Sequence, residues 1–197
     1  KTHNIDSNGI SDSWKYSRLK KNIDFSLREK ELLNLLDKHR GKHGEFDCIV
    51  PGSGGKDSCM QAHILKYKYG MNPLTVTWPP ILYTDYGYKN FKNWLNENDL
   101  QNVSAKKNES LAKYLTKQSI LNIFHPFQSW MIGQKIFPIK MALKYRIPLI
   151  FYGENEAEHG GSSLVESSSS LSDKSRYTLN NLDKVFLGGL KLKQILN

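Results

Sequence analysis

Short apolar segments alternate with longer segments of helical periodicity along most of this chain. Four apolar segments are short enough to be buried strands, and they cover residues 46–50, 74–78, 100–104 and 147–152. The intervening sequence predicts helices from Asp57 or Ser58 to Tyr69 and over residues 88–96, 110–123 and 128–145. This alternation predicts an α/β fold with a doubly wound, mainly parallel sheet and helices on both faces.

The two ends of the chain depart from this alternation. Residues 1–24 are polar and rich in turn signals. A helix is then expected to begin at Ser26, because Glu29 stands at the capping-box spacing, and to end near Gly41. Residues 159–176 are rich in serine and predict a mobile loop or lid, and a last helical pattern runs from about residue 179 to residue 197.

Charge and cysteine usage limit the classes of ligand and compartment. The chain of 197 residues carries 28 Lys+Arg against 19 Asp+Glu, a formal net charge of +9. This excess suits a nucleic acid, an anionic membrane or a small polyanion such as a nucleotide. Two cysteines cannot form a disulfide framework, which favours a reducing compartment. No apolar run reaches the roughly 20 residues of a membrane span, and the N-terminus is polar, so we expect a cytoplasmic protein without membrane contact.

The strongest chemical signal lies between the first predicted strand and its helix. From Gly52 to Ser58 the sequence reads Gly-Ser-Gly-Gly-Lys-Asp-Ser. Backbone N–H groups and the positive end of a helix attract phosphate at such a loop, and glycine lets the backbone approach closely. Ser53 and Lys56 add a hydroxyl and a charge, and Asp57 is expected to cap the helix. The order of strand, loop and helix favours a phosphate loop over an ordinary glycine-rich turn.

Two common nucleotide motifs do not fit this loop. A Walker A loop requires Ser or Thr directly after its Lys, whereas Asp57 follows Lys56 here, and the Gly-x-Gly-x-x-Gly spacing of dinucleotide-binding folds is absent. The run from Ser53 to Ser58 resembles the PP-loop of the ATP pyrophosphatases. That resemblance implies cleavage of ATP between its α- and β-phosphates, adenylation of a carbonyl or carboxyl oxygen, and displacement of AMP by a nitrogen or sulfur nucleophile.

Further segments extend the resemblance over most of the chain, from about Asn4 to Leu196. They cover residues 47–52, 69–78, 83–87, 125–128, 132–135 and 152–158. Together with the loop they look like the N-acetyl sugar amidotransferases. The resemblance implies conversion of the N-acetyl group of a nucleotide-activated sugar into an acetamidino group, for bacterial lipopolysaccharide O-antigen or flagellar glycans. It also implies ATP and Mg²⁺ as cofactors and a separate glutaminase that supplies ammonia.

Two features depart from this family. Many relatives carry an N-terminal Cys cluster, whereas the segment from Asn8 to Trp14 has no Cys, so no structural zinc is predicted. Family chains also run well beyond residue 197, so we expect this chain to be the N-terminal portion of a longer protein. Its expected parts are residues 1–44, a polar segment and helix; residues 45–158, a nucleotide-binding domain; and residues 159–197, a Ser-rich loop and the start of a C-terminal helical region.

The resemblance and the predicted strand ends together assign the site residues. The expected catalytic residues are Lys56, Asp57, Glu154 and Asn155, with Asp57 and Glu154 also binding Mg²⁺. The expected ATP contacts are Ser53, Gly54, Gly55, Lys56, Asp57, Ser58, Thr77, Trp78, Gln134 and Gly153. The expected sugar contacts are Tyr83, Asp85, His125, Lys135 and Glu156. Trp78 is equally consistent with a core aromatic, and a lone His beside Pro, such as His125, is more often structural. Residues 154–158 also fit a solvated acidic loop, although an acidic cluster at a strand end in a basic chain favours function.

Two other functions fit parts of the sequence. The basic charge favours a PP-loop enzyme that modifies tRNA, such as a thiolase or a lysidine-type synthetase. Against it, the chain has no paired Cys for sulfur transfer and no dense stripe of Lys and Arg with aromatics, so no nucleic-acid partner is expected. A nucleotide-binding module without turnover is the third option, and a homo-oligomer is left open.

Overall fold

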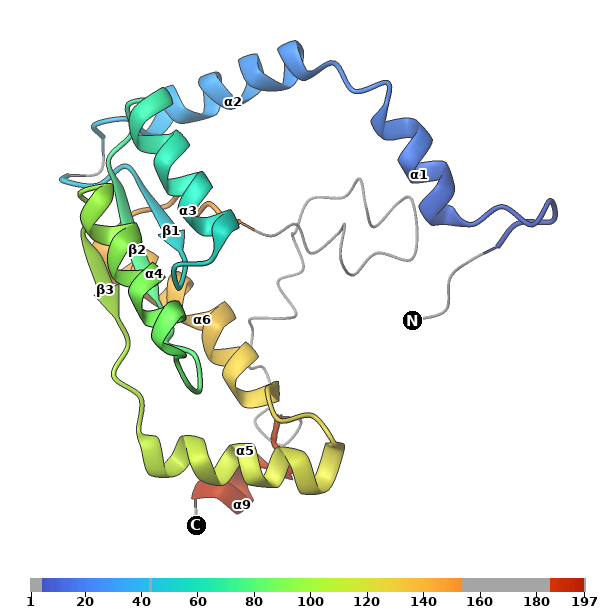
Figure 1. The fold of residues 1–197 in the computed structure, drawn as a ribbon, viewed down its shortest axis with the longest axis vertical. Coiled ribbons are helices and arrows are strands. Elements are labelled where there is room, and N and C mark those ends of the chain that lie inside the picture. Colours follow the sequence, from blue (N-terminus) through green and yellow to red (C-terminus); the bar gives the residue numbers. More distant parts are fainter. Residues whose placement is uncertain (1–4, 43, 154–184, 197) are drawn as a thin grey trace. The chain divides into compact units, whose positions relative to one another are not determined.

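The computed structural model describes residues 5–42, 44–153 and 185–196, which are the coloured parts of Figure 1. The described residues belong to two compact units. One contains the chain up to Lys38, and the other contains His39–Gly153 together with the C-terminal described segment. The predicted Ser-rich loop over residues 159–176 and the beginning of the predicted last helix lie outside the described residues.

The first unit contains a helix that the sequence analysis missed. Helix α1 (Asp12–Lys20) begins after Ser11, whose hydroxyl accepts a hydrogen bond from the Trp14 N–H at 3.3 Å. Helix α2 (Phe25–His39) begins one residue before the predicted Ser26. The Asp24 carboxylate accepts the Leu27 N–H at 3.0 Å, so Asp24 and not Ser26 supplies the cap. Helix α1 escaped prediction because its sequence has little apolar periodicity to signal a buried face.

The second unit is built on a parallel sheet, as predicted, with three strands in place of the four expected. Strands β1 (Cys48–Pro51), β2 (Pro73–Thr77) and β3 (Asn102–Ser104) lie in the order β1-β2-β3, with Ile49 opposite Leu74. The predicted strand over residues 147–152 is reduced to one parallel bridge between Ile150 and Ile49 on the free edge of β1. Two backbone hydrogen bonds form that bridge, from Ile49 N–H to Leu149 at 2.9 Å and from Phe151 N–H to Ile49 at 2.8 Å.

Helices connect the strands in the predicted order. They are α3 (Lys56–His63), the π-helical turn η1 (Ile64–Lys68), α4 (Asp85–Glu97), α5 (Glu109–Ile123) and α6 (Gln128–Tyr145). The chain moves in one direction from β1 through β2 to β3 and then returns past β1 to Ile150. Because parallel crossovers are right-handed, this reversal places α3 and α4 on one face of the sheet and α6 on the other. The structure is therefore a mixed α/β arrangement with helices on both faces.

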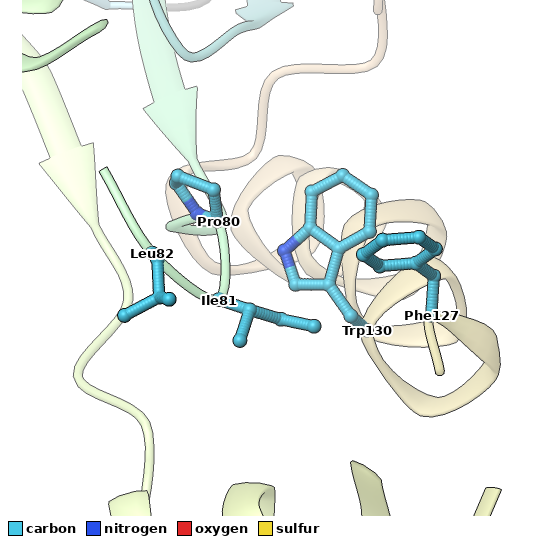
Figure 2. A pocket seen from close by; sticks show the side chains of 5 residues that line it. All are labelled: Pro80, Ile81, Leu82, Phe127 and Trp130. Carbon is cyan, nitrogen blue, oxygen red and sulfur yellow. The ribbon is translucent and has the colours of Figure 1, made fainter. Parts of the chain in front are cut away.

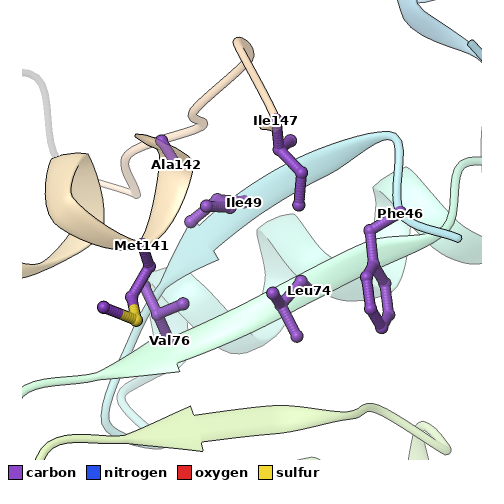
Figure 3. Packing of buried hydrophobic residues seen from close by; sticks show 7 residues of the cluster. All are labelled: Phe46, Ile49, Leu74, Val76, Met141, Ala142 and Ile147. Carbon is purple, nitrogen blue, oxygen red and sulfur yellow. The ribbon is translucent and has the colours of Figure 1, made fainter. Parts of the chain in front are cut away.

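A compact apolar core joins α6 to the sheet. Met141 and Ala142 of α6 pack on side chains of β1 and β2, as Figure 3 shows. The buried cluster consists of Phe46, Ile49, Leu74, Val76, Met141, Ala142 and Ile147. The alternate positions of β2, Thr75 and Thr77, are also fully buried, and the Asn102 amide donates to both hydroxyls at 2.9 Å. This core fixes the strand ends that carry the candidate site.

The C-terminal described segment differs from the helix predicted for it. Strands β4 (Phe186–Leu187) and β5 (Leu190–Lys191) form an antiparallel hairpin, and a short helix α9 (Leu192–Leu196) follows. Gly188 and Gly189 both have positive φ, at 62° and 77°, which makes the turn and interrupts any helix. Across the described part of the chain, no helix combines the length and apolar character needed to cross a membrane.

Candidate functional site

The glycine-rich loop lies at the point where the order of the strands in the sheet reverses. It follows β1, which has β2 on one side and the Ile150 bridge on the other. In open α/β sheets, ligands bind outside the carboxyl ends of the strands at such a switch point. The loop predicted from sequence as a phosphate site therefore occupies the position where this class of fold binds its ligands.

Hydrogen bonds from β2 hold the start of the loop. The Gly52 N–H donates to the Val76 carbonyl at 3.0 Å, and the Thr77 hydroxyl donates to the Gly52 carbonyl at 2.7 Å. Thr77 is fully buried, so its side chain supports the loop rather than facing solvent. The loop is thereby fixed to the neighbouring strand before any ligand binds.

Helix α4 packs against the middle of the loop. Gly54 has a φ of +88°, and a Cβ placed there would lie 2.6 Å from the Phe91 Cα and 2.7 Å from the Phe91 N. Both the dihedral angle and the close backbone therefore require glycine at residue 54. The next glycine differs, since Gly55 has a negative φ and no atom within 4 Å of a Cβ placed on it.

Helix α3 begins at Lys56 and is not capped by Asp57, contrary to the sequence prediction. Gly55 occupies the N-cap position and offers no side-chain hydrogen bond, while Asp57 lies in the first turn. The Ser58 hydroxyl donates back to the Gly55 carbonyl at 3.0 Å. Since the cap carries no side-chain oxygen, the first backbone N–H groups of α3 remain available to solvent or to an anion.

The charges of the loop face solvent. The Lys56 ammonium and the Asp57 carboxylate lie 2.6 Å apart, with side chains 88% and 51% exposed. An exposed pair of this kind is weak because water screens it. An ammonium has three N–H donors, so Lys56 can bind an additional anion while contacting Asp57.

The chain after the Ile150 bridge returns to the start of α3. A Cβ placed on Gly153 would lie 3.1 Å from the Ser58 N and 3.2 Å from the Asp57 carbonyl carbon. The Gln61 amide donates to the Tyr152 carbonyl at 2.8 Å and fixes this approach. Gly153 is thus brought beside the loop. The predicted residues Glu154, Asn155 and Glu156 follow it directly in sequence but lie outside the described residues.

Trp78 packs against α6 at the end of β2. A Cβ placed on Gly133 would lie 2.2 Å from the Trp78 indole, and the Trp78 and Phe137 rings are 5.8 Å apart. The indole N–H is buried and has no hydrogen-bond partner among the described residues. Gln134 is exposed on the same helix and Lys135 is half-buried. Trp78 therefore combines core packing with an indole donor that no described residue accepts, near the strand end.

The other predicted sugar contacts divide between two places. Tyr83 precedes α4, and its ring lies 5.9 Å from that of Phe91, the residue that presses on the loop. The Tyr83 hydroxyl is buried without a partner in the described chain, and burial, with a smaller effect from Tyr88, raises the pKa of this phenol. Asp85 is exposed at the first position of α4. His125 lies in the turn between α5 and α6, with its ring 6.3 Å from that of Phe127.

Sequence analysis missed an apolar pocket beyond the end of β2. It has a volume of about 260 Å³ and is lined by Pro80, Ile81, Leu82, Phe127 and Trp130 (Figure 2). The signal available in the sequence was the apolar run Pro-Pro-Ile-Leu directly after a strand end. An apolar run in that position is at the edge of the sheet where ligands bind.

Two donors hold the segment that forms one side of this pocket. The Trp130 indole N–H donates to the Pro79 carbonyl at 2.8 Å. The Lys107 ammonium donates to the carbonyls of Pro79 at 2.8 Å and Pro80 at 2.9 Å. Burial lowers the pKa of Lys107, and Glu109 partly offsets this effect. Nothing in the sequence distinguished Lys107 from the other basic residues.

The described residues do not by themselves assemble a metal centre. No group of three or more His, Cys, Asp and Glu side chains gathers in the described ranges. Asp57 is the predicted Mg²⁺ ligand that falls within them, and it is exposed at the start of α3. One carboxylate together with phosphate oxygens is a usual arrangement for Mg²⁺, so Asp57 is compatible with that ion.

Comparison with known proteins adds little information about the function of this site. No protein family model matches the chain. A stretch of 53 residues is 38% identical to the uncharacterized protein MJ1599 of Methanocaldococcus jannaschii, and this covers 27% of the present chain. The match spans 19% of the length of that relative, whose name describes no activity. The likeness therefore gives no indication of function.

Proposed function

We propose that this chain is an ATP-dependent amidotransferase of the PP-loop class. In this proposal it converts the N-acetyl group of a nucleotide-activated sugar into an acetamidino group. The observation that supports the proposal most is the loop from Gly52 to Ser58, which lies at the switch point of the sheet and leads into a helix without a side-chain cap. Its sequence resembles the PP-loop, and its position suits the phosphates of ATP.

Each loop residue has a physical task in this proposal. The backbone N–H groups at the start of α3 bind the pyrophosphate portion of ATP, and Ser53 adds a hydroxyl donor. The exposed ammonium of Lys56 offsets the negative charge that develops on the phosphates. Asp57, with Glu154 after Gly153, would hold Mg²⁺, which neutralises phosphate charge when it is bound.

The reaction balances with ammonia as the nitrogen source. The acetamido oxygen attacks the α-phosphorus of ATP, the bond to the β-phosphate breaks, and pyrophosphate leaves. Ammonia then adds to the acetamido carbon, the carbon–oxygen bond breaks, and the oxygen departs with AMP. The remaining protons end on the amidine and in solvent. Positioning the amide oxygen against ATP accelerates the reaction, because it replaces an encounter in solution by a fixed geometry.

Neither cysteine is suited to release ammonia from glutamine. Cys48 is fully buried, and burial, with a smaller effect from Asp47, raises the pKa of its thiol to about 12. Burial also raises the pKa of the Cys59 thiol. A nucleophilic cysteine needs a lowered pKa so that the thiolate is present near neutral pH. We therefore propose that ammonia comes from a separate glutaminase.

The test of the proposed reaction traces the oxygen atom of the acetamido group. The full chain is incubated with ATP, Mg²⁺, ammonium chloride and UDP- or CMP-linked N-acetyl sugars whose acetamido oxygen carries a heavy isotope. Mass spectrometry should find the label in AMP and nitrogen in place of oxygen in the sugar. Unlabelled AMP, or no amidine from any of these sugars, would contradict the proposal.

A variant pair connects this activity to the loop. Lys56→Met should lower pyrophosphate release on the order of a hundredfold, because one charge that stabilises the transition state is removed. Its thermal midpoint should stay unchanged, since the Lys56–Asp57 pair is exposed. Lys113→Met removes an exposed lysine from α5 and serves as the matched control. Equal activity in the two variants would exclude Lys56 from the site.

A further inference from the structure

The apolar pocket after β2 is built to hold a group without reacting with it. Its five lining side chains contain no acid, base or nucleophile. The polar atom of Trp130 is already used, because its indole N–H donates to Pro79. What Trp130 and Phe127 offer to the pocket is therefore aromatic surface, as Figure 2 shows.

Hydrogen bonds hold the backbone at the start of the segment that lines one side of the pocket. Trp130 reaches from α6 and Lys107 from the segment after β3, and both donate to the Pro79 carbonyl at 2.8 Å. The backbone of Pro79 and Pro80, directly before Ile81 and Leu82, is thus held from two elements. A site that is already ordered loses less conformational entropy on binding, so modest aromatic contacts can yield useful affinity.

The size of the pocket and its two aromatic side chains suit a planar ring. A cavity of about 150 Å³ is enough for one benzene ring. The present volume of about 260 Å³ therefore has room for one ring with its substituents. Nucleobases stack on aromatic side chains through their π-faces. Three residues that line the pocket, Pro80, Ile81 and Leu82, follow the carboxyl end of β2, the end of the sheet at which the glycine-rich loop follows β1.

We propose that this pocket binds the pyrimidine base of the nucleotide-activated sugar, an inference that rests on the proposed function. The base is the part of that substrate that does not react, and a pocket without chemical groups suits such a part. Binding energy from a remote, unreactive part of a substrate positions the reacting end. The base in the pocket thereby aligns the acetamido group with ATP at the loop.

Binding measurements without turnover test this inference. Calorimetry compares UDP, CMP and ATP with the full chain and with the variants Trp130→Leu and Phe127→Leu. The dissociation constant for the pyrimidine nucleotide should rise on the order of ten- to a hundredfold in Trp130→Leu, with ATP unaffected. Phe127→Leu is the second pocket variant in case Trp130→Leu does not fold. Phe127 is 51% exposed, so its replacement should leave the fold intact. Trp14→Leu, on α1, is the control that also removes one indole.

Each outcome has a defined meaning. Absence of UDP and CMP binding by the original chain, or unchanged pyrimidine binding in both pocket variants, overturns the inference. Weaker ATP binding with intact UDP and CMP binding also overturns it, because the pocket would then hold adenine. Pyrimidine binding that depends on the pocket, without amidine formation in the isotope experiment, supports the pocket and contradicts the proposed reaction.

Discussion

Thr77 illustrates how one side chain can serve a site by holding its backbone. Its hydroxyl donates to the Gly52 carbonyl at 2.7 Å and accepts the Asn102 amide at 2.9 Å. A buried hydroxyl with both partners satisfied is stable where an unpaired one would be costly. The sequence placed Thr77 at a strand end and suggested contact with ATP. The structure gives it a supporting contact with the loop, which depended on partners distant in sequence.

Cys48 gives a prediction about stability in alkaline solution. The pKa of its thiol is about 12 in the folded chain against an ordinary value of 9.0. Between these values the folded protein keeps a proton that the unfolded chain loses, so Cys48 makes stability fall as pH rises. Its stabilising effect is complete below the ordinary pKa and disappears as pH approaches the folded value. The slope is about 1.4 kcal/mol per pH unit.

The measurement compares urea unfolding of the original chain and Cys48→Ala. The variant lacks this titration, although it also loses buried volume. The free-energy difference between the two proteins should therefore shrink above about pH 9, where the thiol of the unfolded chain begins to ionise. Parallel pH profiles would mean that burial of Cys48 does not suppress its ionisation.

At the scale of secondary-structure elements, helix α4 packs against the glycine-rich loop and restricts which residues the loop can contain. The loop places Gly54 where the Phe91 backbone leaves no room for a side chain. The φ of +88° at Gly54 is also disfavoured for other residues. One residue later, Gly55 has neither constraint. The two adjacent glycines therefore have different reasons to be present, and the difference is measurable.

Alanine at each glycine separates these reasons. Gly54→Ala should lower the free energy of unfolding by about 2–4 kcal/mol, through the unfavourable φ and the overlap with Phe91. Gly55→Ala should cost less, about 0.5–1 kcal/mol, because alanine is a poorer N-cap than glycine but meets no neighbouring atom there. Urea unfolding of both variants measures the difference. Similar losses in the two variants would contradict the close approach of α4 to the loop.

At the scale of the whole second unit, Asp47 ties together segments from three parts of the chain. It is 5% exposed and precedes β1. Its carboxylate accepts the N–H groups of Gly41, which follows α2, and of Asn72, which precedes β2, the latter at 2.8 Å. This junction lies at the amino ends of the strands, opposite the candidate site. A buried carboxylate with satisfied oxygens fixes such a junction well.

Loss of that carboxylate should therefore destabilise the unit without touching the site. Asp47→Ala leaves two backbone donors without their acceptor and should cost about 3 kcal/mol. Asp47→Asn should recover part of the loss, because an amide keeps one acceptor oxygen. Glu97→Ala, an exposed position at the end of α4, should change stability little. Thermal or urea unfolding of the three variants measures this order, and equal stability of Asp47→Ala and Glu97→Ala would contradict it.

Local patterns were enough for the elements whose signals are strong. The predicted helix over residues 128–145 is α6, with the same bounds, and the first three predicted strands are confirmed as a parallel sheet. Two weak signals failed. Helix α1 has no clear apolar stripe, and residues 185–191 look helical although Gly188 and Gly189 make them a hairpin. In each case the deciding interaction was a cap or a turn dihedral rather than periodicity.

The sequence by itself determined the order of the elements from the first strand to the helix over residues 128–145, the position of the glycine-rich loop after the first strand, and the charge that suits an anionic ligand. Periodicity and glycine placement are local properties, so they can be inferred from neighbouring residues. Only the tertiary structure decided that Gly54 abuts Phe91, that Gly153 returns to Ser58, and that Trp130 and Lys107 hold Pro79. Those contacts join residues far apart in sequence. They form only once the strands have their order in the sheet and the helices cover its two faces.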